Sequence, residues 1–110
     1  MKIYKYRSHY ETYDIAIYKA SYQLDDSLAI VAIIASGPEK ENLFAHMTVN
    51  LRDNKLKENQ AYVDTNNLPD IANWLEEKGL AKNTGKAKQS GFCTYPLMEF
   101  YLNKIEILED

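Results

Sequence analysis

Apolar and polar residues alternate with a period of two along two segments of the first half of the chain. In 13–18, Tyr13, Ile15 and Ile17 alternate with smaller or more polar residues, which is the pattern of a half-buried strand. In 43–51, apolar residues again take every second position. This second segment predicts the clearest half-buried strand in the sequence.

Residues 28–35, LAIVAIIA, are apolar at every position. Eight residues are few for a helix, and Ile and Val favour strands. The segment therefore predicts a central strand covered on both faces and ended by Ser36-Gly37-Pro38, although its regularly spaced alanines leave a helix open. Short gaps between these strands favour antiparallel hairpins, because a parallel crossover needs a dozen or more residues.

One helix is predicted, at about residues 68–78. Its apolar stripe consists of Ile71, Trp74 and Leu75. Its start signals are a polar cap, a proline and an acid: Asn66 or Asn67, Pro69 and Asp70. At its end, Gly79 is placed to adopt the left-handed conformation, and Leu80 to contact Leu75, as in a Schellman motif.

Two polar segments, 52–60 and 81–91, predict exposed loops. Between the first loop and the helix, 61–63 predicts a short strand. After Pro96, alternation in 98–102 predicts a last strand, which Ile105 and Ile107 can extend. The sum is an α+β fold, an antiparallel sheet of four to six strands with the helix packed on one face.

Length and composition place this fold in a small globular protein. A chain of 110 residues predicts a single domain, 1–110. No apolar run reaches the length of a membrane span, and the first residues lack the apolar core of a signal peptide. One cysteine, Cys93, allows no internal disulfide. We expect a cytoplasmic protein that needs no membrane and no cofactor.

The mild net charge of -3 conceals a local asymmetry. Residues 78–98 contain four lysines and no acid, so they carry +4 while the remainder carries -7. Lys82, Lys86 and Lys88 precede two aromatic residues, Phe92 and Tyr95, and cations beside aromatic rings can hold phosphates and stacked bases. The ordinary interpretation is a solvated loop, and the acidic total argues against a dedicated nucleic-acid binder.

Residues suited to catalysis are sparse. The segment 79–86, GLAKNTGK, is not a phosphate-binding loop, because its glycines are too far apart and alanine follows the lysine. Cys93, His46 and Asp64 form the one set that could support a nucleophile, but nothing in the sequence places them together. The two histidines, His9 and His46, lie on different elements and make a weak case for a metal.

Two further features suggest a binding surface. The polar run 64–67 includes Asp64 and Asn66, which favour turns and caps or else form a recognition corner. Nine tyrosines are an unusual number for this length, and tyrosine is enriched at interfaces. Tyr4 and Tyr6 share one face of the first strand, and Tyr18 lies on the second. The other three early tyrosines are Tyr10, Tyr13 and Tyr22. Rim packing on a small sheet is the ordinary interpretation, and a protein-binding or self-association face is the alternative.

Several strings resemble an uncharacterised bacterial family, domain-of-unknown-function family four-three-one-three. These strings are YVDTNN at 62–67 and SGFCTYPL at 90–97, with MTVNL at 47–51 and the tyrosine-rich N-terminal strands. The resemblance covers most of the chain. It implies a small accessory protein of conjugative elements and plasmids of Gram-positive bacteria, with no established activity and no catalytic residue. It adds weight to a shared surface or fold corner at Asp64, Asn66, Asn67, Cys93, Tyr95 and Pro96.

Three hypotheses follow from the sequence. The first is a non-enzymatic interaction protein, with a protein partner or a second copy of the chain bound through its tyrosines. The second is a nucleic-acid-binding accessory protein that uses the lysine-rich segment 78–95. The third and most remote is a small enzyme that depends on Cys93.

Overall fold

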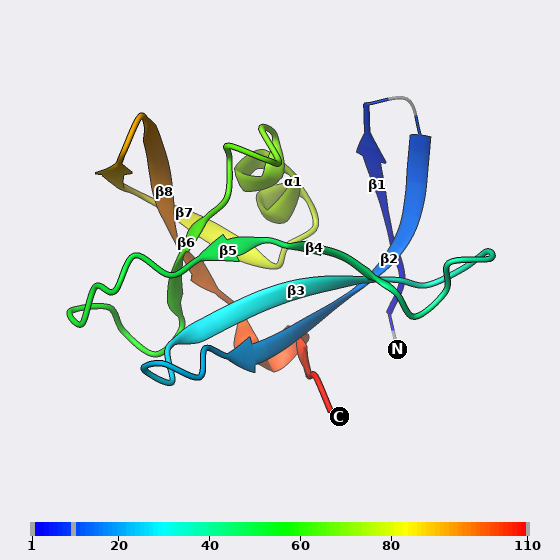
Figure 1. The fold of residues 1–110 in the computed structure, drawn as a ribbon, viewed down its shortest axis with the longest axis horizontal. Helices are drawn as coiled ribbons and strands as arrows, with labels where there is room; N and C mark the ends of the chain where they lie inside the picture. Colours follow the sequence, from blue (N-terminus) through cyan, green and yellow to red (C-terminus); the bar gives the residue numbers. More distant parts are fainter. Residues whose placement is uncertain (1, 10, 110) are drawn as a thin grey trace.

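The computed structural model describes residues 2–9 and 11–109, which form two sheets and one α-helix (Figure 1). Sheet A contains β1 (Tyr4–Ser8), β2 (Glu11–Ser21), β3 (Leu28–Ile34), β4 (Leu43–His46) and β9 (Glu106–Ile107). Sheet B contains β5 (Thr48–Val49), β6 (Gln60–Val63), β7 (Ala81–Ser90) and β8 (Cys93–Phe100). The helix is α1 (Ile71–Glu77), and a short 3-10 helix, η1 (Leu102–Lys104), follows β8. The α+β class is confirmed, but the strands divide between two sheets where the sequence predicted one.

The segment 43–51 carries the chain from sheet A to sheet B, so the prediction of one continuous strand is wrong. Met47 separates β4 from β5 and is fully buried. Its N–H donates to Ile30 in sheet A (2.8 Å), and its carbonyl accepts the N–H of Asp64 at the end of β6 (2.9 Å). The crossing also turns Thr48 inward, where its Oγ1 accepts the N–H of Ile30 at 3.1 Å. An alternating pattern cannot reveal such a crossing, because both short strands keep the same period.

The all-apolar segment forms β3, the central strand of sheet A, as predicted. It pairs antiparallel with β2 on one side and with β4 on the other. Ile30 and Ala32 are fully buried on one face, and Ala29 and Val31 are buried on the other. Burial on both faces explains why no polar residue interrupts the segment.

The helix ends as predicted but starts later. Gly79 has φ +71° and donates to Glu76 (3.0 Å), while Leu80 donates to Leu75 (3.0 Å). These are the two hydrogen bonds of a Schellman motif. At the other end, α1 begins at Ile71 with Asp70 as its N-cap residue. The predicted cap at Asn66 or Asn67 is therefore wrong.

The segment 81–91 is not a loop but the strand β7, paired with β8 in an antiparallel hairpin. Ser90 pairs with Cys93 across a two-residue turn in which Gly91 has φ +62°. Glycine first in a two-residue turn is typical of a type II′ hairpin. The segment looks like a loop because β7 is an edge strand that protrudes from the core, so most of its residues are exposed and polar.

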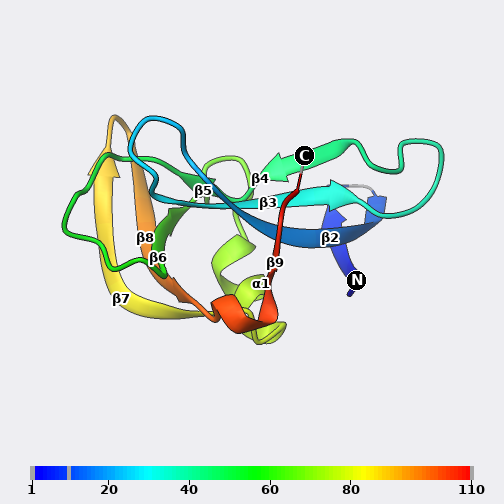
Figure 2. The same ribbon diagram turned by 90° about the horizontal axis from the view of Figure 1, so that it is seen from below.

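The C-terminal residues return to sheet A, which corrects the predicted extension of the last strand. After β8 ends at Phe100, η1 reverses the chain and places Ile105 in the core. Glu106 and Ile107 then pair in parallel with Tyr18 and Lys19 of β2. Figure 2 shows β9 beside β2, far from the hairpin of β7 and β8.

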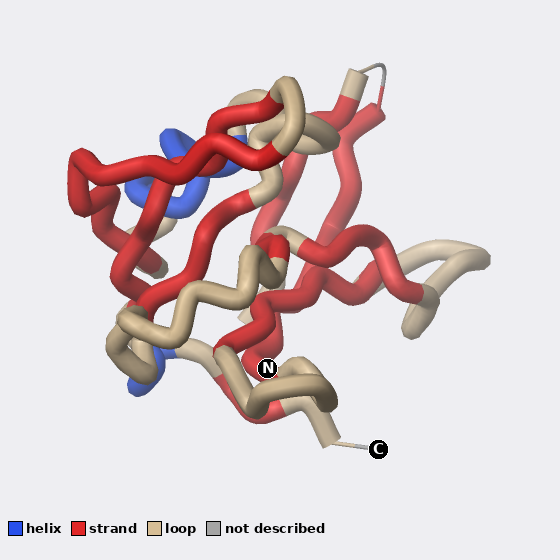
Figure 3. The backbone as a smooth tube through the Cα atoms, turned by 60° about the vertical axis from the view of Figure 1, so that its left-hand side comes forward, coloured by secondary structure: helices blue, strands red, loops and turns tan. Residues whose placement is uncertain are grey.

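The core lies between the two sheets and α1, whose buried residues are Ile71, Trp74 and Leu75. Seen as a tube, the chain has far more strand than helix, and the helix lies against one side (Figure 3). Within the described part of the chain, no helix is long and apolar enough to cross a membrane.

Candidate functional site

Two of the tyrosines predicted for an interaction surface lie in the core. Tyr6 is 2% exposed and Tyr4 is 9% exposed, and both rings meet Trp74 edge-on. The Tyr6 hydroxyl donates to Asp70 Oδ1 at 2.7 Å. Burial, and then the Asp70 carboxylate, raises the pKa of Tyr6 far above its ordinary value. Tyr4 and Tyr6 are therefore removed from the candidate surface, because their rings are covered and the Tyr6 hydroxyl is engaged.

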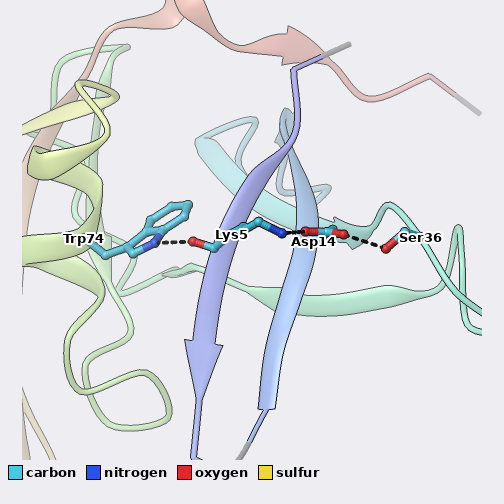
Figure 4. Close-up of polar contacts among 4 residues, drawn as sticks. All are labelled: Lys5, Asp14, Ser36 and Trp74. Carbon is cyan, nitrogen blue, oxygen red and sulfur yellow. Dashed lines mark hydrogen bonds and ion pairs between the residues drawn. The ribbon is translucent and has the colours of Figure 1, made fainter.

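A row of polar contacts closes this same region toward solvent (Figure 4). The indole N–H of Trp74 donates to the carbonyl of Lys5 (3.0 Å), and the Lys5 ammonium donates to Asp14 (2.9 Å). Ser36 donates to the other oxygen of Asp14 at 2.8 Å. Hydrogen bonds from Lys5 and then Ser36 lower the pKa of Asp14. The row links α1 to β1, β2 and the segment after β3, so it holds the fold together.

The remaining early tyrosines do not form one face. Tyr18 is half-buried in β2 and lines a groove of about 620 Å³ near β9. Tyr13 packs on Phe44 with ring centroids 4.8 Å apart, and the hydroxyl of Tyr22 bonds to Thr48 at 2.9 Å. Tyr10 lies outside the described residues.

The polar run at 64–67 forms a turn. Asp64 is 7% exposed, and its two carboxylate oxygens accept the backbone N–H (3.2 Å) and the side-chain N–H (2.8 Å) of Asn67. Asn66 is exposed beside it. The side chains of Asp64 and Asn67 are thus bound to each other within the turn.

The lysines gather on the outer face of sheet B. Strand register places Gln60, Glu99 and Lys82 in one row across the sheet, and Tyr95 opposite Lys88 in a row nearer the hairpin turn. The segment between β5 and β6, residues 50–59, passes along this face (Figure 2). Between the segment and β7 lies a groove of about 570 Å³, which we call the lysine groove.

Cations border the lysine groove on both sides. Lys55 and Lys57 come from the segment 50–59, and Lys82 and Lys86 come from β7. Within the described residues, none of these lysines forms an ion pair, in contrast to Lys5. The sequence identified the β7 side alone, because the path of segment 50–59 over sheet B is a tertiary feature.

The acids of the lysine groove are already hydrogen-bonded to neutral donors. The Tyr62 hydroxyl donates to Asp53 at 2.7 Å, and Gln60 Nε2 donates to Glu99 at 3.0 Å. The hydrogen bond from Tyr62 is the main cause that lowers the pKa of Asp53, while burial and Asp53 raise the pKa of Tyr62 to about 12. Four lysines against two acids leave the lining at +2, in a chain whose total is -3.

Aromatic rings continue this surface toward the hairpin turn. Phe92 lies in the turn and is fully exposed. Tyr95 is half-buried in β8, and a hydrogen bond involving Cys93 is the main cause that raises the pKa of Tyr95. The hairpin thus brings Lys82, Lys86, Lys88, Phe92 and Tyr95 onto one antiparallel unit.

The candidate catalytic residues come from three different parts of the fold. His46 lies at the end of β4 in sheet A, whereas Cys93 begins β8 in sheet B. Across residues 2–9 and 11–109, no group of three or more histidine, cysteine or acidic side chains could hold a metal ion.

A second groove, of about 650 Å³, lies on the other side of the segment 50–59. It shares Asp53, Leu56, Lys57 and Gln60 with the lysine groove. Its lining has four acids (Asp25, Asp26, Asp53 and Glu58) and three cations (Lys19, Arg52 and Lys57), a balance of -1. The lysine groove, at +2, is the more positive of the two.

Comparison with known proteins gives one match. Residues 12–110 match the family model for a domain of unknown function, DUF4313. No curated protein and no solved structure matches the chain. The match covers nine-tenths of the sequence and confirms the resemblance seen in its strings. The chain belongs to the DUF4313 family.

Proposed function

We propose that this DUF4313 protein is a non-enzymatic interaction module that binds an anionic partner through the lysine groove. The observation that carries the proposal is a groove of about 570 Å³ that is lined by two lysines on each side. Unpaired lysines concentrated in a groove raise the local concentration of anions, whatever the net charge of the whole chain. The proposal includes a cytoplasmic location and the accessory role on a mobile element that the family resemblance implies.

This proposal replaces the tyrosine face with a different surface. Tyr4 and Tyr6 were the main support for an apolar protein interface, and both are buried. Lysines of β7 are exposed, and within the described residues none of them forms an ion pair. A binding surface needs groups that are available to a partner, and the lysine groove provides them.

Heparin, a sulfated polysaccharide, is a direct probe of this surface. We expect the protein to be retained on immobilised heparin at low salt and released as salt is raised. The double variant Lys57→Glu/Lys86→Glu removes one lysine from each side of the groove and should lose retention. The control is Lys40→Glu, an exposed position in the segment between β3 and β4, at the opposite end of the molecule from the hairpin (Figure 1).

The outcome is decisive in both directions. Retention that survives in Lys40→Glu and disappears in the double variant supports the proposal, provided that thermal unfolding shows both variants folded. If the native protein passes through the column at low salt, or if both variants lose retention equally, the lysine groove does not bind anions and the proposal fails.

A further inference from the structure

We infer that the anionic partner of the lysine groove is single-stranded nucleic acid, held by its phosphates with bases stacked on the hairpin. The inference rests on the proposed function and deepens it by naming the ligand class. Three observations favour this ligand over an acidic protein and over a duplex: the length of the surface, the aromatic residues at its end and the interruption of the edge strand.

The surface has the dimensions of a short oligonucleotide site. From Glu99 to Cys93, β8 spans about 20 Å, since a strand rises roughly 3.3 Å per residue. The lysine groove occupies the end near Glu99, and the Lys88–Tyr95 pair and Phe92 continue toward the turn. This length suits roughly four nucleotides, the lower end of the range for OB folds that bind single strands.

The aromatic residues favour unpaired bases. Phe92 is 106% exposed relative to a reference chain, so its ring is free to stack. Tyr95 lies on the same hairpin opposite Lys88. Stacking on an aromatic ring requires the face of a base, which a duplex covers with the neighbouring base pairs.

A peptide partner could bind by pairing as an additional strand with β7, the edge strand of sheet B. The edge of β7 is poorly suited to such pairing. Its register shifts between Asn83 and Ala87, where Gly85 has φ +83°. A bulge of this kind bends an edge strand and interrupts the regular hydrogen-bonding positions that strand addition needs. The edge therefore favours recognition by side chains over recognition by backbone pairing.

The groove predicts weak sequence preference. Its cations are all lysines, and Arg52 lines the neighbouring groove instead. Lysine acts as a point charge on phosphate, whereas arginine provides the bidentate fork that reads guanine. We therefore expect DNA and RNA strands of different sequence to bind with similar affinity.

Fluorescence anisotropy with labelled oligothymidine of about 12 nucleotides, a blunt duplex of the same length and polyglutamate tests the inference. Single strands should bind most tightly. Engagement of three or four phosphates predicts a slope of roughly -2 to -3 in a plot of log affinity against log salt. Lys57→Glu/Lys86→Glu should abolish binding.

Phe92→Ser should weaken single-strand binding on the order of tenfold, without changing retention on heparin. Leu24→Ser is the matched control, because Leu24 is also an exposed apolar residue (66%). It lines neither of the two grooves that flank segment 50–59. Leu24→Ser should leave single-strand binding unchanged.

Each alternative result has one meaning. Equal binding of duplex and single strand, tighter binding of polyglutamate, or no effect of Phe92→Ser overturns the inference. Retention on heparin without binding of any DNA or RNA strand overturns it too, yet leaves the proposed function intact. Failure to bind heparin and oligonucleotide alike overturns both.

Discussion

The region around Trp74 and the outer face of sheet B use polar side chains in opposite ways. Around Trp74, aromatic rings are buried, and the Tyr6 hydroxyl and the indole N–H each have a partner inside the protein. On sheet B, the lysines are exposed, and within the described residues no acid lies close enough to pair with them. The first arrangement stabilises the fold, and the second leaves charge available to a partner.

This contrast corrects an assumption about tyrosine. A high tyrosine content indicates an interface only when the rings remain accessible. In this protein the rings of Tyr4 and Tyr6 fill the space between β1 and α1, so they contribute to folding rather than to binding. Net charge is equally uninformative, because the groove is positive within an acidic chain.

The strongest test of the contrast is Trp74→Ala. The substitution removes a ring that is 7% exposed and contacts both Tyr4 and Tyr6. We expect a loss of about 3–5 kcal/mol in the free energy of unfolding, as for other large aromatic truncations in cores. Urea unfolding followed by circular dichroism measures it.

Phe92→Ser provides the comparison on the open side. Because the Phe92 ring is fully exposed, its loss should change the free energy of unfolding by less than about 0.5 kcal/mol. Equal destabilisation by Trp74→Ala and Phe92→Ser would show that the two regions do not differ as described.

An effect between those of Trp74→Ala and Phe92→Ser is expected from Tyr6→Phe, which keeps the ring and removes only the hydroxyl. The hydrogen bond to Asp70 (2.7 Å) is lost, and such a bond contributes about 1 kcal/mol. Asp70 is exposed, so water can replace the lost donor and limit the cost. The same urea experiment, run beside Tyr4→Phe, separates the hydroxyl of Tyr6 from a general effect of removing tyrosine hydroxyls.

Local features of the fold could be predicted from the sequence, whereas features set by distant contacts could not. The apolar run of β3 and the Schellman ending at Gly79 follow from nearby residues alone, and both are confirmed. The crossing at Met47 could not be predicted, because its backbone hydrogen bonds go to Ile30 and Asp64, far away in the chain. The parallel pairing of β9 with β2 was missed for the same reason.

The candidate site shows the same division. The lysines of β7 stood out in the sequence, although they were placed in a loop because polar residues occupy both faces of an edge strand. The turn at Gly91 carried the missing signal, since glycine first in a two-residue turn is typical of a hairpin. Lys55 and Lys57 could not be found without knowing that segment 50–59 crosses sheet B.

A slight effect on the free energy of unfolding is expected from Tyr62→Phe. Tyr62 combines the two arrangements, because its ring is buried while the residue lines the lysine groove. The Tyr62 ring is buried beneath segment 50–59, while its hydroxyl reaches the half-buried Asp53 at 2.7 Å. This bond ties down one side of the lysine groove. Near neutral pH we expect only a slight loss of stability, since water reaches Asp53 readily.

The acid side of the pH dependence reports this bond, because the hydrogen bond from Tyr62 is the main cause that lowers the pKa of Asp53. The alkaline side reports mainly the burial of the Tyr62 hydroxyl, which is the first cause of its raised pKa. The pKa of Tyr62 rises from 10.0 to about 12 in the folded protein, so its stabilising contribution is complete below pH 10.0 and is lost between those two values. The pKa of Asp53 is lowered from 3.8, so its contribution is present above that value and is lost as pH falls through the lowered pKa. The difference in urea midpoint between native protein and Tyr62→Phe should therefore be constant through the neutral range and shrink toward both extremes. A difference that does not shrink as pH falls through the lowered pKa of Asp53 would mean that Tyr62 supports segment 50–59 by its ring alone, and that the lysine groove is held by packing rather than by the bond to Asp53.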